Sequence, residues 1–143
     1  MNRFIKLVCV ILAFTICLSI PAAAEVINTR ASDFFHAIST YIYKLNTTQF
    51  QVWFDVCAVE GMDEIGACKI TVQRSADGEN WQNMFSYLPE YYPQMLDYNT
   101  VEHGAYVPYH GTQGYYYRAF VTFYAKNSSG SGKLYRYTNT VYL

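Results

Sequence analysis

The sequence has little charge and no cluster of basic residues. Lys, Arg, Asp and Glu make up 15% of the chain, and the formal net charge is −1. Proteins that bind nucleic acid or anionic membranes gather Lys and Arg on one surface. The ten such residues of this chain are scattered along the sequence. The sequence therefore predicts neither a nucleic-acid-binding protein nor one held to a membrane by charge.

Patterns typical of catalysis and of metal binding are also missing. No serine lies in a Gly-x-Ser-x-Gly elbow, and no pair of carboxylates has a pattern that places it across a cleft. No two histidines have the i, i+4 spacing of a helical metal site. The three histidines are His36, His103 and His110. We therefore expect a non-enzymatic protein with no cofactor and no metal.

An acidic segment with glycines on both sides is the one candidate for a cation site. Glu60, Asp63 and Glu64 supply the oxygen ligands that calcium prefers, but they lack the regular spacing of known calcium loops. We interpret residues 60–66 as a solvated connection between two strands, with Met62 and Ile65 tucked into the end of the predicted sandwich as its anchors.

The first 24 residues have the parts of a secretory signal peptide. Arg3 and Lys6 precede an apolar run from residue 7 to residue 20, and Pro21 is followed by three alanines. We expect cleavage after Ala24, which gives a secreted protein without membrane insertion. An uncleaved membrane anchor over residues 7–24 is the alternative. Cleavage would leave eight basic and eleven acidic side chains.

Two cysteines, Cys57 and Cys68, lie beyond the predicted signal peptide. Outside the reducing cytosol, a single disulfide between them would close a short loop and stabilise the fold by about 2 to 4 kcal/mol. Strand alternation opposes this prediction, because Cys57 is expected to point outward while Cys68 shares the inward parity of Ile70 and Val72. Two free thiols remain the alternative.

Apolar and polar residues alternate over most of the chain after residue 37, as they do in half-buried strands. Residues 25–36 show no sustained period and are predicted to form an N-terminal arm, and residues 37–143 one domain. An Asp-Gly turn at residues 77–78 and a Gly/Ser turn at 128–132 each predict a hairpin. The strands are expected near residues 38–43, 50–59, 69–74, 82–87, 101–109, 116–125 and 134–142. This spacing predicts an all-β fold, an antiparallel β-sandwich of about seven strands.

Two segments resemble extracellular fibronectin type III-like modules, which share the immunoglobulin-like sandwich. The first is Lys69–Trp81, a strand followed by Arg-Ser, an Asp-Gly turn and a tryptophan. The second is Tyr117-x-Ala-x-Val-x-Phe-x-Ala125, followed by Asn127, Gly130 and residues 138–141. The resemblance implies that Tyr117 is the corner tyrosine, whose hydroxyl bonds to backbone upstream.

A second resemblance spans nearly the whole predicted domain. The sequences at residues 30–33, 61–67, 123–125 and 130–132 resemble a family of small secreted proteins from Gram-positive bacteria, known as a domain of unknown function. This resemblance implies a secreted protein and supplies no catalytic residues.

Fifteen tyrosines are the remaining clue to function. An exposed group of tyrosines offers a large, rigid contact surface, although tyrosines also decorate ordinary β-sheets. We expect the contact surface in the 87–98 loop and on the mixed face of the second strand, at Tyr91, Tyr92, Tyr98 and Trp53. The predicted function is a secreted, non-catalytic interaction or structural module whose partner is an unknown protein or glycan at the cell surface. A carbohydrate-binding module using exposed Tyr and Trp is the alternative.

Overall fold

The computed structural model describes residues 33–143, which form seven antiparallel strands and no α-helix. The all-β prediction is confirmed. The strands are β1 (Phe35–Lys44), β2 (Gln49–Ser75), β3 (Gln82–Tyr87), β4 (Leu96–His110), β5 (Tyr116–Asn127), β6 (Gly130–Tyr137) and β7 (Val141–Tyr142), with one 3₁₀ turn, η3 (Pro93–Met95). The predicted signal peptide and residues 25–32 of the predicted arm lie outside the described residues. No helix in the described part is long and apolar enough to span a membrane.

β2 is one continuous strand of 27 residues, so the predicted connection at residues 60–66 is wrong. Gly61 and Asp63 disfavour a strand locally, but pairing and burial override them. Met62 pairs with Thr100 of β4 and Ile65 pairs with Asp97, and both side chains are buried. The predicted burial of both side chains is therefore confirmed, but they lie within a strand and not in a loop.

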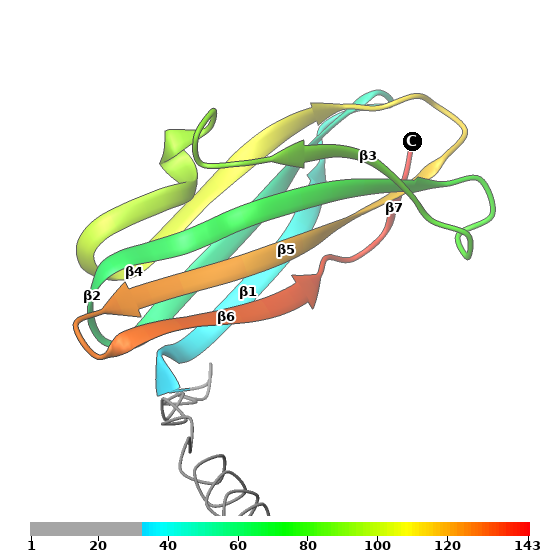
Figure 1. Ribbon diagram of the computed structural model, residues 1–143. Helices are drawn as coiled ribbons and strands as arrows, with labels where there is room; N and C mark the ends of the chain where they lie inside the picture. The colour runs from blue at the N-terminus through cyan, green and yellow to red at the C-terminus, as the bar shows by residue number, and fades with distance from the viewer. Residues whose placement is uncertain (1–32) are drawn as a thin grey trace, which may run out of the picture.

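The sheet curls so that the two halves of β2 belong to two facing layers (Figure 1). Residues 50–58 of β2 pair with β1, and residues 49–57 and 62–66 pair with β4. Residues 64–75 pair with β5, and residues 70–74 pair with β3. β6 and β7 both pair with β5. Layer one therefore contains β1, the first half of β2 and β4, and layer two contains β3, the second half of β2, β5, β6 and β7.

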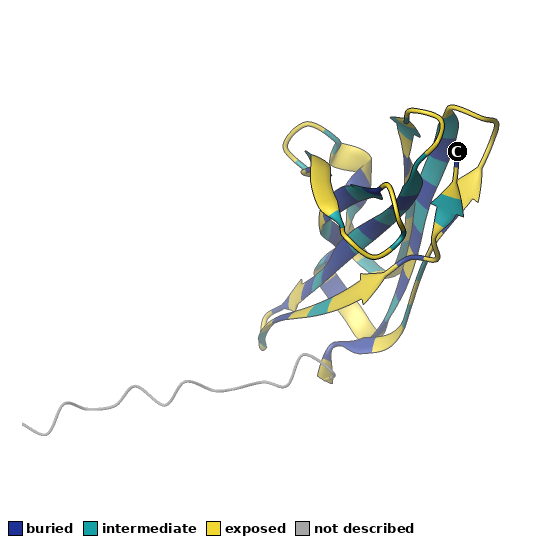
Figure 2. Cartoon of the chain, turned by 90° about the vertical axis from the view of Figure 1, so that its right-hand side faces the viewer, coloured by how far each residue is buried: buried dark blue, intermediate teal, exposed yellow. Residues whose placement is uncertain are grey.

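The core lies between the layers, where inward side chains from both meet. Phe54 of layer one contacts Phe123 of layer two at a ring-centroid distance of 6.4 Å, and Phe50 contacts Tyr117 at 5.3 Å. All four side chains are buried, and burying a phenylalanine stabilises the fold by about 1.5 to 3 kcal/mol. Along most of β5, buried positions alternate with half-buried ones, as the sequence predicts (Figure 2).

Gly66 lies where β2 passes from one layer to the other. Its φ is 151°, and a Cβ there would overlap the carbonyl oxygen of Met95. Only a glycine allows the backbone of η3 to approach β2 this closely. Position 66 is therefore a structural requirement of the curled sheet.

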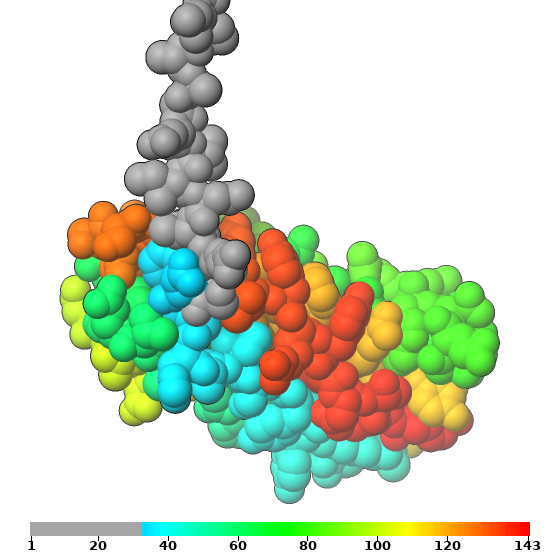
Figure 3. Space-filling model, turned by 90° about the horizontal axis from the view of Figure 1, so that it is seen from below, coloured from blue at the N-terminus to red at the C-terminus, as the bar shows by residue number. Residues whose placement is uncertain are grey.

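Side chains tie the layers together at both open edges of the sheet. The Asn139 side chain accepts a bond from the Ile42 N–H and donates to the Ile42 carbonyl. Arg136 donates to the carbonyl of Ile38, at 2.9 Å. These contacts hold the end of the chain against β1 (Figure 3). At the opposite edge, the Tyr87 hydroxyl of β3 donates to the carbonyl of Pro108 in β4.

Candidate functional site

Three aromatic rings lie side by side on the outer surface of layer one. Tyr41, Trp53 and Tyr106 are direct cross-strand neighbours on β1, β2 and β4, so strand pairing alone puts them on one face. Trp53 and Tyr41 have parallel ring planes, within 1°, with centroids 6.2 Å apart, and Trp53 and Tyr106 are 4.7 Å apart. We call these three residues the aromatic row. The Trp53 Nε1–H donates to the Gln51 side chain at 3.0 Å, which fixes the orientation of the indole.

The aromatic row is partly open to solvent. Tyr41 is 43% exposed and Tyr106 is 42% exposed, while Trp53 between them is half-buried. A ring row of this kind is a flat apolar surface with polar tips, which suits a ligand that is itself flat and hydroxylated.

A groove of about 520 Å³ opens on the same strands beside the aromatic row. Asp55 lies next to Trp53 on this face of β2, and its carboxylate accepts a bond from the Ser39 hydroxyl at 3.3 Å. Opposite Asp55 is Gly104, where any Cβ would overlap the carboxylate. The lining residues are Ala37, Ile38, Ser39, Asp55, Val56, Cys57, Glu102, His103 and Gly104.

The outward positions of the paired part of this layer carry two carboxylates, Asp55 and Glu102, and no Lys or Arg. We call this surface, with its aromatic row and groove, the acidic face. Its size falls in the range of small-molecule sites, and it combines apolar rings with a few polar groups.

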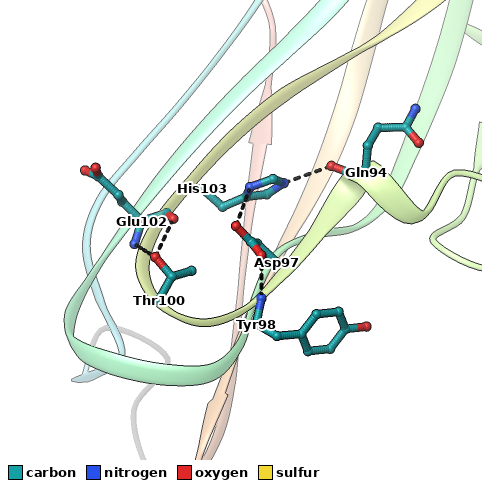
Figure 4. Close-up of polar contacts among 6 residues, drawn as sticks. All are labelled: Gln94, Asp97, Tyr98, Thr100, Glu102 and His103. Carbon is teal, nitrogen blue, oxygen red and sulfur yellow. Dashed lines mark hydrogen bonds and ion pairs between the residues drawn. The ribbon is translucent and has the colours of Figure 1, made fainter.

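His103 points to the inner side of β4, where its ring lies 5.7 Å from that of the buried Phe54, and Figure 4 shows its polar contacts. Its Nε2 lies 2.8 Å from the carbonyl oxygen of Gln94, and its Nδ1 lies 3.7 Å from a carboxylate oxygen of Asp97. A histidine that activates a nucleophile needs a hydroxyl or thiol on its second nitrogen. Here both nitrogens face groups of the neighbouring turn, so His103 holds the start of β4 and positions the backbone next to Glu102.

The structure separates the predicted contact residues. Trp53 lies in the aromatic row, whereas Tyr91 lies in the turn after β3 and is 71% exposed, and Tyr98 lies at the start of β4 and is 59% exposed. Tyr92 packs on the core, with its ring edge-on to Tyr87 at 4.7 Å. The ring neighbours of Trp53 are Tyr41 and Tyr106, and none of the predicted tyrosines is among them.

The predicted disulfide is wrong, because Cys57 and Cys68 are both free thiols. They lie eleven residues apart on the same strand, where the chain rises about 3.3 Å per residue, while a disulfide needs Cα atoms within about 7 Å. Cys57 lines the groove of the acidic face. Cys68 lies at a register shift of β2 against β5, and burial raises the pKa of its thiol.

Sequence reasoning missed Tyr41, Tyr106 and the polar groups of the groove. The signal for them was the alternation itself, since Tyr41 is opposite in parity to the buried Ile42 and Tyr106 to the buried Val107. Alternation does not predict the register of strand pairing, which places these two rings beside Trp53.

No group of three or more His, Cys, Asp or Glu side chains among residues 33–143 is placed to hold a metal ion. Comparison with protein-family models and with curated proteins gives no match for the chain. The proposals below therefore depend on the residues and their geometry.

Proposed function

We propose that the protein is a secreted, non-catalytic binding module and that carbohydrate is the ligand of its acidic face. The observation that carries this proposal is the aromatic row beside an open, polar groove. One face of a pyranose ring carries mostly C–H bonds, which pack on aromatic rings, while its rim carries hydroxyls that need hydrogen-bond partners. The aromatic row offers rings on which the C–H face can pack, and the groove offers hydrogen-bond partners for the hydroxyls.

The groups of the groove match hydroxyls better than they match an anion. Carboxylates accept strong hydrogen bonds from hydroxyl donors but repel other carboxylates and phosphates. The Ser39 hydroxyl and the Gln51 amide extend the polar strip on both sides of the rings. A neutral sugar chain lying across β1, β2 and β4 would therefore pack on the aromatic row and have hydrogen-bond acceptors along its side.

The strand arrangement supports the finer proposal of a fibronectin type III or immunoglobulin-like sandwich. In that arrangement strands A, B and E share one sheet, and C, F and G share the other. β1, the first half of β2 and β4 have the A, B and E pairings, and the second half of β2, β5 and β6 have those of C, F and G. This chain would then be a variant in which B and C are one continuous strand.

The contacts of Tyr117 point the same way. Its hydroxyl accepts a bond from the Thr112 N–H at 2.8 Å and donates to the Thr112 carbonyl at 3.3 Å. Thr112 lies five residues upstream, in the turn before β5, which is the geometry of a corner tyrosine.

Secretion and membership of the Gram-positive family remain proposals that depend on the sequence. The opening segment, with its basic start, apolar run and alanines, supports export.

The test is binding of the purified chain to an array of neutral oligosaccharides, followed by calorimetry on the retained sugars. Trp53→Ala should weaken binding at least tenfold, because it removes the central ring of the aromatic row. Tyr91→Ala is the matched control, since it removes an exposed ring away from the row and should leave affinity unchanged. Retention of full affinity in Trp53→Ala, or an array with no neutral ligand, would refute the proposal.

A further inference from the structure

The outer surface of layer two is basic, although Lys and Arg are scattered in the sequence. Its outward positions carry Lys69 on β2, Arg118 and Lys126 on β5, and Lys133 on β6. Among the outward positions of these paired strands the one carboxylate is Glu64, which pairs with Lys126 at the end of the layer. We call this surface the basic face.

Aromatic rings fill the space between these cations. Phe120 has a ring plane within 6° of that of Tyr135, at 5.8 Å, and its ring lies 4.7 Å from that of Tyr137. Tyr135 is 59% exposed and Tyr137 is 48% exposed. The basic face therefore presents flat apolar surface as well as charge.

Arg118 is held rigidly at one end of the rings. Its guanidinium lies 4.2 Å from the ring centroids of both Trp81 and Tyr137, and its Nε–H donates to the Gln73 side chain at 2.8 Å. A guanidinium fixed in this way loses little further freedom when it pairs with a carboxylate.

Lysines lie at the other end of the rings. Lys133 and Lys126 are exposed, and Lys133 lies 5.9 Å above the ring of Tyr124. Arg118 and Lys126 are eight residues apart on β5, which corresponds to about 26 Å along an extended strand. Charges separated by that distance, with rings between them, suit a linear partner with repeated anionic groups.

We propose that the basic face binds an acidic polysaccharide, whose sugar rings pack on Phe120, Tyr135 and Tyr137 while its carboxylates pair with Arg118 and the lysines. Charge complementarity requires an anionic partner, and the exposed rings require one with apolar ring faces. Linear phosphate polymers supply only the charge. Nucleic acid supplies both, but each of its strands carries a phosphate about every 3.4 Å, which the few spaced cations of the basic face do not match.

The experiment uses the full chain and oligogalacturonate as the probe, with the methyl-esterified oligomer as a matched ligand that keeps the rings and loses the charge. Calorimetry should show binding of oligogalacturonate and at least tenfold weaker binding of the ester. The Lys126→Gln, Lys133→Gln double variant and Tyr135→Ala should each weaken oligogalacturonate binding at least tenfold. Lys44→Gln, which removes a charge from outside the basic face, should leave it within twofold of the unaltered chain.

Several results would overturn the proposal. They are no binding of oligogalacturonate, equal binding of the ester, or equal or tighter binding of polyphosphate or an oligothymidylate. Sedimentation velocity without ligand gives one more such result. If the unaltered chain is a dimer and the double lysine variant is a monomer, a second copy of the chain covers the basic face. Thermal melts of each variant show whether it is folded. Trp53→Ala should keep its affinity for oligogalacturonate, so this test and that of the acidic face fail separately.

Discussion

The two outer faces of the sandwich are built alike and charged oppositely. On the acidic face, Trp53 lies between two tyrosines and beside Asp55 and Glu102. On the basic face, Phe120 lies between two tyrosines in a strip bounded by Arg118 and the lysines. A row of cross-strand rings therefore does not define a ligand by itself, because the same arrangement of rings occurs beside carboxylates on one face and beside cations on the other.

β2 is the reason that one chain has two such faces. Its outward residues before Met62, including Asp55, belong to layer one, and those after Gly66, including Lys69, belong to layer two. The period-2 pattern is the same on both sides, but the curl of the sheet turns the two sets of outward side chains in different directions. The fold therefore places the acidic and basic side chains on different faces, although they are scattered along the sequence.

The largest effect on stability is expected from a substitution at Gly66, where β2 passes from one layer to the other. Gly66→Ala should lower the free energy of unfolding by about 2 to 5 kcal/mol, because the new Cβ overlaps the Met95 carbonyl and the φ is strained for alanine. Denaturant unfolding measures the change, and both faces should lose their ligands together. Gly61→Ala is the matched control, since a Cβ at position 61 meets no atom within 4 Å. Equal stability of the two variants would refute the role given to Gly66.

A smaller effect is expected from Tyr87, which ties layer two to layer one. Burial raises the pKa of Tyr87 above its ordinary value of 10.0, and the neighbouring Tyr92 and Tyr109 add to the shift. From about pH 10 upward the unfolded chain loses this phenolic proton while the folded chain keeps it, so the free energy of unfolding should fall.

Tyr87→Phe tests this prediction by unfolding at a series of pH values. At neutral pH the variant should be less stable by about 1 to 3 kcal/mol, since the Pro108 carbonyl loses its donor. Above pH 10 its stability should decline less steeply than that of the unaltered chain. A decline of unchanged slope would show that Tyr87 does not titrate as described.

The faces themselves should separate cleanly in binding. Trp53→Ala should weaken the affinity for a neutral sugar at least tenfold, or by about 1.4 kcal/mol, and should leave the affinity for an acidic sugar unchanged. Tyr135→Ala should do the reverse. Calorimetry measures the affinity of each variant for each of the two ligands. If either variant loses binding of both ligands, the two faces are not independent.

The smallest expected effect is on the chemical reactivity of the two thiols, Cys57 and Cys68. Mass spectrometry without reduction should find that both Cys57 and Cys68 can be alkylated in the unfolded chain. In the folded chain, Cys68 should react slowly at neutral pH and faster as the pH rises, because burial raises its thiol pKa and the thiolate is the reactive form. A mass two units lower, from a bridged pair, would contradict the free thiols of the structure.

Much of the fold could be predicted from local pattern. The hairpins at residues 77–78 and 128–132 follow from turn chemistry, and the burial of Tyr117, Val121 and Phe123 follows from alternation. The continuity of β2 could not be predicted, because glycine and acidic residues at 60–64 give a local signal for a loop. Pairing with β4, a segment some forty residues later, decides against that signal.

The candidate site was less predictable than the fold. Trp53 was identified from its place on a mixed strand face, but its neighbours come from strands far apart in sequence whose register only the folded sheet fixes. Closeness in sequence is the one reason to expect the tyrosines of residues 87–98 on a common surface. Folding packs Tyr92 against Tyr87 and leaves Tyr91 and Tyr98 exposed in different places.

The bonds of Asn139 and Arg136 to β1 have a consequence for how copies of the protein behave when crowded. A foreign strand that tried to extend the sheet beside β1 would first have to displace both side chains from the backbone of Ile38 and Ile42. Occupied edges of this kind suppress strand addition, the usual first step of amyloid-like assembly. The side chains of Asn139 and Arg136 therefore occupy backbone groups at this edge that an added strand would need.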